Sequence, residues 1–201
     1  MSSNTSYKTL SEPSSGVYKE KGSRFYSYAY PIDSEDDVKI FLQKVKTEHH
    51  SARHHCFAYL IGKDGAKFRA NDDGEPSGTA GKPILGQINS NNLTNVLIIV
   101  VRYFGGRLLG TSGLIRAYKA AAADAIRNGK IVVRTIKKQI QINFPYPLIN
   151  EVMKILKQGN YKPLEQEFGD VCKIVTEIPE ADVEYVSGKL ELLEGISINV
   201  S

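Results

Sequence analysis

The segment Asn95–Arg102 has the sequence NVLIIVVR. Six consecutive branched aliphatic residues, Val96–Val101, form its centre. Such a run is typical of a β-strand covered on both faces, so we expect it at the centre of a sheet with helices on either side. The 201-residue chain is 41% hydrophobic and 24% charged. These values are near the average for globular proteins and argue against a disordered or fibrous chain.

Strands and helices are predicted on both sides of the central segment. Up to residue 128 the pattern predicts strands over 25–31, 54–61 and 67–70, the central strand over 95–102, and helices beginning near 34, near 84 and at 111. Ser34–Asp37 is a capping sequence for the first helix, and Gly62–Gly65 is a turn between two strands. Thr111 or Ser112 is the expected N-cap of the last helix, which Gly129 ends.

A second pattern follows Gly129. It predicts strands over 136–144, 161–168, 171–177 and 196–200, with helices over 148–158 and 182–193. This βαββαβ order is the ferredoxin-like arrangement. We therefore predict an α+β chain with a flexible, Ser/Thr-rich tail over 1–16, a first domain over 17–134 and a ferredoxin-like domain over 135–201.

The densest motif is the segment Asn71–Pro83, with the sequence NDDGEPSGTAGKP, which precedes the helix near 84. Its glycines would let backbone N–H groups approach an anion at a helix N-terminus, and Lys82 would add positive charge. A magnesium ion could instead be held by three carboxylates, those of Asp72, Asp73 and Glu75. A third interpretation is a structural turn in which the acids cap backbone amides. The spacing is not that of a Walker loop.

The second motif, Arg102–Gly113, runs from the central strand into the helix over 111–128. Ligands of open α/β sheets favour the carboxyl ends of strands, and this position carries paired glycines between two arginines. From residue 102 to 119 there are four bases and no acid: Arg102, Arg107, Arg116 and Lys119. Helical spacing places Arg116, Lys119 and Arg127 on one face, which is either a solvated surface or part of an anion site. The absence of acids favours the anion site.

All four histidines, at positions 49, 50, 54 and 55, lie close to Cys56. On a strand, His54 and Cys56 would share a face, but two ligands are fewer than zinc usually takes from a protein. Neighbouring positions on a strand also do not establish a nucleophile and its base. We therefore assign neither a metal site nor catalytic residues, and an enzymatic activity stays open but is not favoured.

Four stretches together resemble the YigZ/IMPACT family in order and spacing: Ser23-Arg24-Phe25, Ala52–Tyr59, Asp72–Gly81, and Val101–Gly106 followed by Leu109-Gly110. The resemblance implies a first domain like the second domain of a small-subunit ribosomal protein and like domain IV of the translocating elongation factor. It implies a second domain like domain V of that factor. Eukaryotic members of the family regulate translation initiation through a kinase-activating partner with the help of an additional N-terminal domain, so the resemblance does not imply that mechanism for this chain.

From these motifs we expect a translation-associated regulatory protein that binds RNA, the ribosome or another phosphate-containing ligand through one basic cleft of the first domain. The candidate site residues are Arg24, His54, Asp73, Glu75, Ser77, Thr79, Gly81, Lys82, Arg102, Gly105, Gly106, Arg107, Arg116 and Lys119. One alternative is a metal-dependent phosphoryl-transfer or hydrolytic enzyme acting on a small phosphorylated molecule. A second is an adaptor for a protein partner in translation control.

The sequence also gives expectations for cofactors and for cellular location. No cofactor is expected for a binding protein, and magnesium is expected only for the enzyme alternative. The longest apolar run, Val96–Val101, is too short to cross a bilayer, and the first residues lack a basic-then-apolar signal pattern. The two cysteines are far apart in sequence, which fits a reducing compartment. We expect a cytoplasmic protein without membrane association or recognition of DNA sequence.

Overall fold

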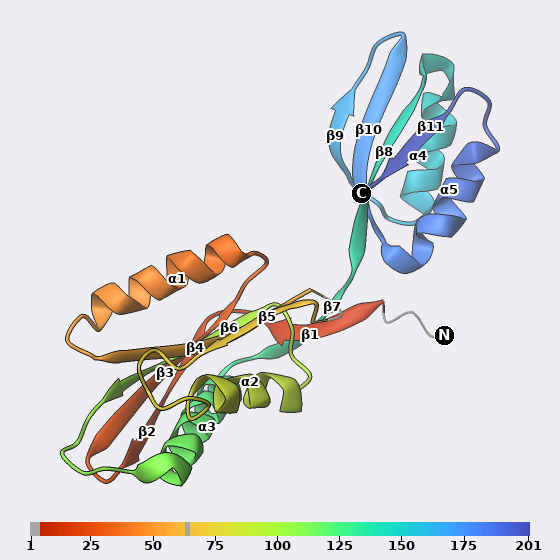
Figure 1. Cartoon of the computed structure of the whole chain (residues 1–201). Helices are drawn as coiled ribbons and strands as arrows, with labels where there is room; N and C mark the ends of the chain where they lie inside the picture. Colours follow the sequence, from red (N-terminus) through yellow and green to blue (C-terminus); the bar gives the residue numbers. More distant parts are fainter. Residues whose placement is uncertain (1–4, 63–64) are drawn as a thin grey trace. The chain divides into compact units, whose positions relative to one another are not determined.

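The computed structural model describes residues 5–62 and 65–201. Two residues of the expected turn over 62–65, Lys63 and Asp64, lie outside this range, as do residues 1–4 of the expected tail. The chain divides into two compact units between Arg134 and Thr135 (Figure 1). We call Ser6–Arg134 the first unit and Thr135–Ser201, which also includes Thr5, the second unit.

The first unit is built on a five-stranded sheet with the order β2-β3-β6-β4-β5. Its strands are β2 (Ser14–Glu20), β3 (Ser23–Pro31), β4 (His54–Ile61), β5 (Lys67–Asn71) and β6 (Val96–Tyr103). All four neighbouring pairs are antiparallel. Helix α1 (Glu35–Glu48) lies on one face of the sheet, and α2 (Gly81–Ser90) and α3 (Gly110–Asn128) lie on the other (Figure 1).

The predicted central strand is confirmed, because β6 lies in the middle of this sheet and is buried from Val96 to Arg102. Successive side chains of a strand point to opposite faces, so β6 contributes to two separate cores. Val96, Ile98 and Val100 pack with α2 and α3. Leu97, Ile99 and Val101 pack on the face of α1. The run is uniformly apolar because both faces are covered.

The predicted helices are present, and one predicted cap is wrong. Ser34 caps α1 through a complete capping box with Asp37, as expected. Helix α3 ends before Gly129 as predicted, but its N-cap is Leu109, and neither predicted hydroxyl caps it. Gly110, with φ of +70°, starts the helix before Thr111 and Ser112, so both hydroxyls lie inside the first turn.

The prediction of a flexible tail is wrong for residues 6–16. Strand β1 (Ser6–Leu10) pairs with β7 (Ile131–Thr135), and Leu10 is fully buried in the core of the first unit. Strand β2 packs on α3 so closely that a Cβ on Gly16 would lie 2.7 Å from the backbone nitrogen of Ala125. The partner of β1 lies more than 100 residues away in sequence, and β2 combines the pairing with its neighbour β3 with the distant contact to α3, so the local composition of Ser and Thr did not predict either strand.

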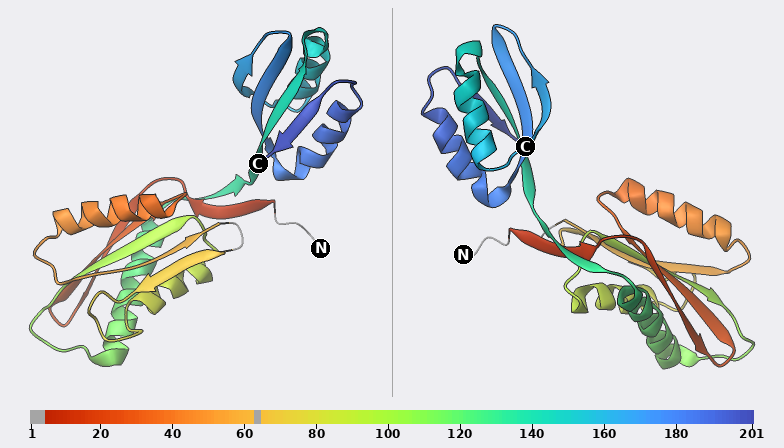
Figure 2. Two further views of the ribbon diagram at one scale, coloured as in Figure 1. Left: turned by 45° about the horizontal axis from the view of Figure 1, so that its top comes forward. Right: turned by 180° about the vertical axis from the view of Figure 1, so that it is seen from behind.

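The second unit has the predicted βαββαβ order. Its elements are β8 (Lys137–Pro145), the 3₁₀ turn η1 (Tyr146–Leu148), α4 (Ile149–Gln158), β9 (Pro163–Glu167), β10 (Val171–Pro179), the 3₁₀ turn η2 (Glu180–Asp182), α5 (Val183–Glu191) and β11 (Ser197–Val200). The sheet order is β11-β8-β10-β9, with antiparallel neighbours throughout. Both views of Figure 2 show α4 and α5 on the same face of this sheet, where they form its core.

The α+β fold class predicted from the sequence is confirmed in both units. None of the helices that the structure describes is long and apolar enough to cross a lipid bilayer.

Candidate functional site

The sequence motifs meet at one end of the five-stranded sheet. Arg102 is paired with His54 across β6 and β4, and Tyr103 is paired with Arg24 across β6 and β3. The loop over 72–80 follows β5 at the same end, where Asn71 pairs with Phe57 of β4. We call the β2–β3 turn with the adjoining Arg24, the residue Arg53 that precedes β4, the loop over 72–80 and the loop over 104–109 together the loop end.

Residues at the loop end divide between the two faces of the sheet. Residues that pair directly in antiparallel strands point to the same face, so His54 and Arg102 share the face of α2 and α3. Arg24 and Tyr103 share the opposite face, on the side of α1. The predicted site residues are therefore divided: His54 and Arg102 share one face as expected, whereas Arg24 lies on the other.

A buried ionic network occupies the face of α2 and α3. Arg102 Nη1 donates to Glu75 Oε1 at 2.7 Å, and Tyr118 OH donates to the same oxygen at 2.8 Å. The Glu75 side chain is 3% exposed and that of Arg102 is 8% exposed. The guanidinium lies between the rings of Phe25 and Phe104, 5.5 and 5.6 Å from their centroids. Two predicted site residues, Glu75 and Arg102, thus form an internal ion pair instead of an open anion site.

The other acids of the Asn71–Pro83 motif cap backbone amides. The Asp72 carboxylate accepts hydrogen bonds from the backbone nitrogens of Gly78, Ala80 and Gly81 at 2.8 to 3.0 Å. Burial alone would raise the pKa of Asp72, but these N–H donors hold it below its ordinary value. Asp73 accepts from the His55 backbone nitrogen at 2.7 Å. This geometry favours the structural-turn interpretation of the motif over a magnesium site.

Several small residues of the two motifs also have structural contacts. A Cβ on Gly105 would lie 1.9 Å from the carbonyl carbon of Gly22, so this glycine lets the loop over 104–109 pack against the β2–β3 turn. A Cβ on Gly81 would lie 2.5 Å from the Asn71 nitrogen. Thr79 is buried and donates its hydroxyl to the Pro76 carbonyl at 2.6 Å. Ser77 and Gly106 are exposed.

His54 and Cys56 do not form a metal or nucleophile site. His54 Nδ1 lies 2.9 Å from the Asp73 carbonyl oxygen, which holds the ring in place. Cys56 is fully buried, and this burial raises the pKa of its thiol well above the ordinary value. A buried, protonated thiol is not a nucleophile. Across residues 5–62 and 65–201, no group of three or more His, Cys, Asp or Glu side chains is arranged to hold a metal ion.

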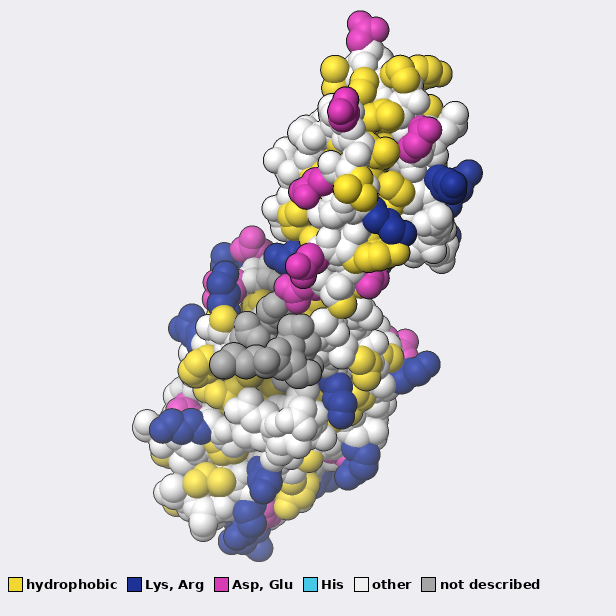
Figure 3. All heavy atoms as spheres, turned by 90° about the vertical axis from the view of Figure 1, so that its right-hand side faces the viewer, with side chains coloured by type: hydrophobic (Ala, Val, Ile, Leu, Met, Phe, Trp, Pro, Cys, Tyr) yellow, Lys and Arg dark blue, Asp and Glu magenta, His cyan; other side chains and the backbone are white. Residues whose placement is uncertain are grey.

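The acids of the loop end have hydrogen-bond partners within the protein, whereas several of its bases are exposed and unpaired among residues 5–62 and 65–201. Within the described part of the chain, four exposed bases of this end have no ion-pair partner: Lys21, Arg24, Arg53 and Arg107. Figure 3 shows Lys and Arg side chains spread over the first unit, several of them at its lower end. Other predicted bases, Lys82 and Lys119, are exposed as well, whereas Arg116 pairs with Glu20 at 3.2 Å.

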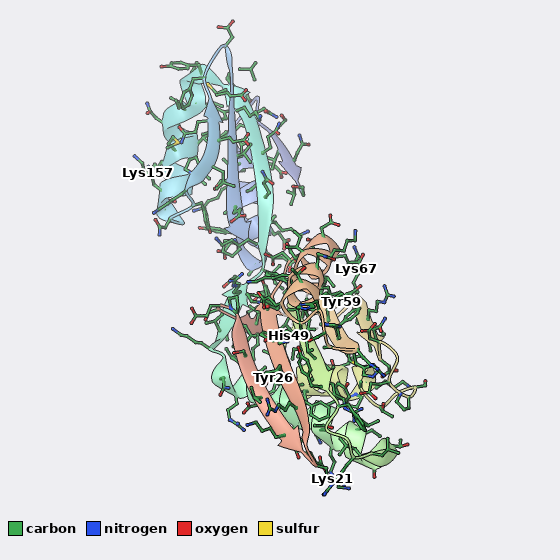
Figure 4. All side chains as sticks on the ribbon, turned by 90° about the vertical axis from the view of Figure 1, so that its left-hand side faces the viewer. Lys21, Tyr26, His49, Tyr59, Lys67 and Lys157 are labelled. Atoms are coloured by element: carbon green, nitrogen blue, oxygen red, sulfur yellow. The ribbon has the colours of Figure 1, made fainter. Side chains whose placement is uncertain are left out.

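A second feature of the loop end, which the sequence did not reveal, is an open pocket on the face of α1. It has a volume of about 420 Å³ and is lined by Gly22, Arg24, Tyr26, His49, Tyr103 and Phe104. The rings of Tyr26 and His49 are stacked, with centroids 5.6 Å apart, and Figure 4 labels both residues. Aromatic residues at alternate positions of β3 were the available signal, but the same alternation is expected of a core.

His49 is held rigidly within this pocket. Its Nε2 lies 2.6 Å from the Tyr28 hydroxyl and its Nδ1 lies 3.0 Å from the Tyr103 hydroxyl. Burial lowers the pKa of His49, so the ring is neutral at physiological pH. Both nitrogens are occupied, and the imidazole therefore serves as a fixed planar wall.

Comparison with known proteins places the chain in a family. The family described as the Impact N-terminal domain matches residues 21–126, and the IMPACT family member YvyE of Bacillus subtilis (strain 168) is 31% identical over 198 residues. That alignment covers 94% of this chain and 91% of the relative. The chain belongs to the IMPACT family. The IMPACT family member YigZ of Escherichia coli (strain K12) is 33% identical over 180 residues, which cover 89% of this chain and 88% of the relative.

A solved crystal structure shares the fold of this chain. This crystal structure, described as that of a hypothetical protein, is 32% identical in sequence and has a TM-score of 0.75. The alignment covers 98% of this chain and 96% of the chain in that structure. The family resemblance inferred from the four sequence motifs is thus confirmed. The segment that matches the IMPACT domain, residues 21–126, contains the whole loop end, including the buried ionic network and the aromatic pocket.

Proposed function

We propose that this IMPACT family member is a translation-associated regulatory protein that binds RNA, free or in the ribosome, through the exposed bases of its loop end. One observation carries the proposal: the acids at this end have internal partners, whereas Lys21, Arg24, Arg53 and Arg107 project into solvent. Phosphate groups neutralise such bases and release counterions, which is the main source of affinity for nucleic acids. The resemblance of the first domain to translation components supports RNA as the partner.

The enzyme alternative has less support. A magnesium ion at Asp72, Asp73 and Glu75 would have to replace the hydrogen bonds that these carboxylates already accept. The arginine that would contact a phosphate, Arg102, is buried in an ion pair. An open end with separated bases suits an extended polyanion better than it suits a reaction on a small molecule.

A salt titration tests the proposal. Fluorescence anisotropy with a structured ribosomal RNA fragment should show affinity falling with salt, with a log–log slope of about −3 if four bases each contact one phosphate. The double variant Lys21→Glu/Arg107→Glu should flatten this slope by about one or more. Both side chains are exposed and unpaired in the described structure, so the variant should remain folded.

The matched control is Lys154→Glu/Lys157→Glu, which makes the same charge change on the exposed face of α4 in the second unit. This control should leave the slope unchanged if the loop end is the binding surface. Absence of wild-type binding at low salt would reject RNA and favour a protein partner. An equal flattening of the salt slope in both double variants would reject the loop end as the RNA-binding surface.

A further inference from the structure

The aromatic pocket on the face of α1 has the chemistry of a site for a planar, anionic ligand. Three of its six lining residues, Tyr26, Tyr103 and Phe104, carry aromatic rings, and His49 adds a fourth planar ring. A volume of about 420 Å³ falls within the range of small-molecule sites, roughly 300 to 1,000 Å³. Gly22 has no side chain to close the mouth.

The walls of this pocket are already in place. His49 is fixed by hydrogen bonds at both ring nitrogens, and Tyr26 packs edge-on against Tyr103 with centroids 5.8 Å apart. Phe104 is 59% exposed, yet its ring rests on the buried Arg102 guanidinium. A flat ligand would therefore meet aromatic surfaces that need little ordering when it binds.

The charge around the pocket selects the sign of the ligand. Arg24 lines the mouth, is exposed and has no ion-pair partner within the described residues. Lys21 precedes Gly22 at the rim, and Arg107 follows Phe104 by three residues. A cationic ligand, such as a methylated amine, would be repelled by Arg24. A planar ring that carries a phosphate could stack on the aromatic walls and place its phosphate beside Arg24.

We propose that the pocket binds one unpaired nucleotide of an RNA strand, with the base against Tyr26 and Phe104 and its phosphate at Arg24. The inference rests on the proposed RNA binding and adds a base-stacking site to it. A free mononucleotide shares this chemistry, but the basic side chains of Lys21 and Arg107, which lie outside the pocket, suit further phosphates of an RNA strand. Stacking on aromatic side chains is a general means of holding single-stranded nucleic acid with little sequence preference.

The experiment compares two strands that differ only in their bases. Fluorescence anisotropy at low salt is measured with an oligouridylate of about twelve nucleotides and with an abasic strand of the same length and charge. Wild-type protein should bind the oligouridylate about tenfold more tightly. Tyr26→Leu and Phe104→Ala should reduce this ratio to near one. Tyr26→Phe keeps the ring and should preserve the ratio, which separates loss of stacking from loss of fold.

Arg107→Ala is the matched electrostatic control, because this exposed base does not line the pocket. It should weaken both strands equally and leave their ratio unchanged. Equal wild-type affinity for the two strands would overturn the stacking site while leaving RNA binding intact. Failure of both strands to bind would instead reject the proposed function. Displacement of the oligouridylate by a stoichiometric amount of uridine monophosphate would reject an RNA strand as the ligand and assign the pocket to a free nucleotide.

Discussion

The two faces of the five-stranded sheet use neighbouring residues of β6 in opposite ways. Arg102 points toward α2 and α3 and is buried in an ion pair with Glu75. Tyr103, the next residue, points toward α1 and lines an open pocket. Both positions belong to the same family motif. A charged motif can therefore maintain the fold while an aromatic surface beside it remains open to solvent.

The largest effect is expected from breaking the buried face. Arg102→Met leaves the Glu75 carboxylate buried without its cation, so we expect the free energy of unfolding to fall by about 3–5 kcal/mol. Urea denaturation measures this loss. The exposed and unpaired Arg107 provides the matched control, and Arg107→Met should change stability by no more than about 0.5 kcal/mol.

A double variant sharpens this comparison. Glu75→Leu/Arg102→Met removes both charges and should recover part of the loss. A deficit of about 1–3 kcal/mol should remain because the buried Tyr118 hydroxyl loses its acceptor. A double variant no more stable than Arg102→Met would contradict the assignment of the loss to an unpaired charge.

An intermediate effect is expected where the β2–β3 turn contacts the loop over 104–109. Gly105→Ala should lower the free energy of unfolding by about 1–3 kcal/mol, because its Cβ would overlap the Gly22 backbone. Gly86→Ala is the control. Gly86 lies in α2 with open space around it, so alanine there should stabilise the protein by about 0.5–1 kcal/mol. Equal behaviour of the two variants in urea denaturation would show that the close approach at Gly105 is not needed.

Local pattern predicted much of the fold. The apolar run Val96–Val101, the stripe of α3 and the βαββαβ order of the second unit each depend on residues near one another in sequence. Strands β1 and β2 could not be found in this way. Apart from the pairing of β2 with the neighbouring β3, their contacts are with α3, β7 and the segment over 93–95, and these appear only when distant parts of the chain are brought together.

The candidate site was predicted less completely than the fold. Residue type located the loop end, but it could not decide which charges are paired, because Glu75 and Arg102 are 27 residues apart in sequence. Alternation along β6 and β3 also separates Arg24 from Arg102, and this follows only from the register between the strands. The aromatic pocket depends on His49 at the end of α1 meeting Tyr26 and Tyr103, a contact that no single motif encodes.

The smallest effect concerns Asp72, whose carboxylate caps backbone amides at the start of α2. Asp72→Asn keeps one acceptor oxygen but loses the bond from the Gly78 nitrogen to Oδ2. We expect a loss of about 1 kcal/mol in unfolding free energy at neutral pH. The pKa of Asp72 is lower in the folded state than its ordinary value of 3.8, so the folded protein binds the proton less readily than the unfolded chain.

The sign of the pH dependence follows from that difference. The stabilisation by the Asp72 carboxylate is fully present above pH 3.8 and is lost as the pH falls through the folded pKa. The stability difference between wild type and Asp72→Asn should therefore shrink in acid, while other carboxylates titrate in both proteins and cancel. Asp36→Asn is the control, because Asp36 is exposed and pairs with Lys39 on the surface of α1. Urea denaturation at several acidic pH values measures the stability difference. A difference between wild type and Asp72→Asn that stayed constant with pH would contradict the capping role, because the charge of Asp72 would then contribute nothing to stabilising the start of α2.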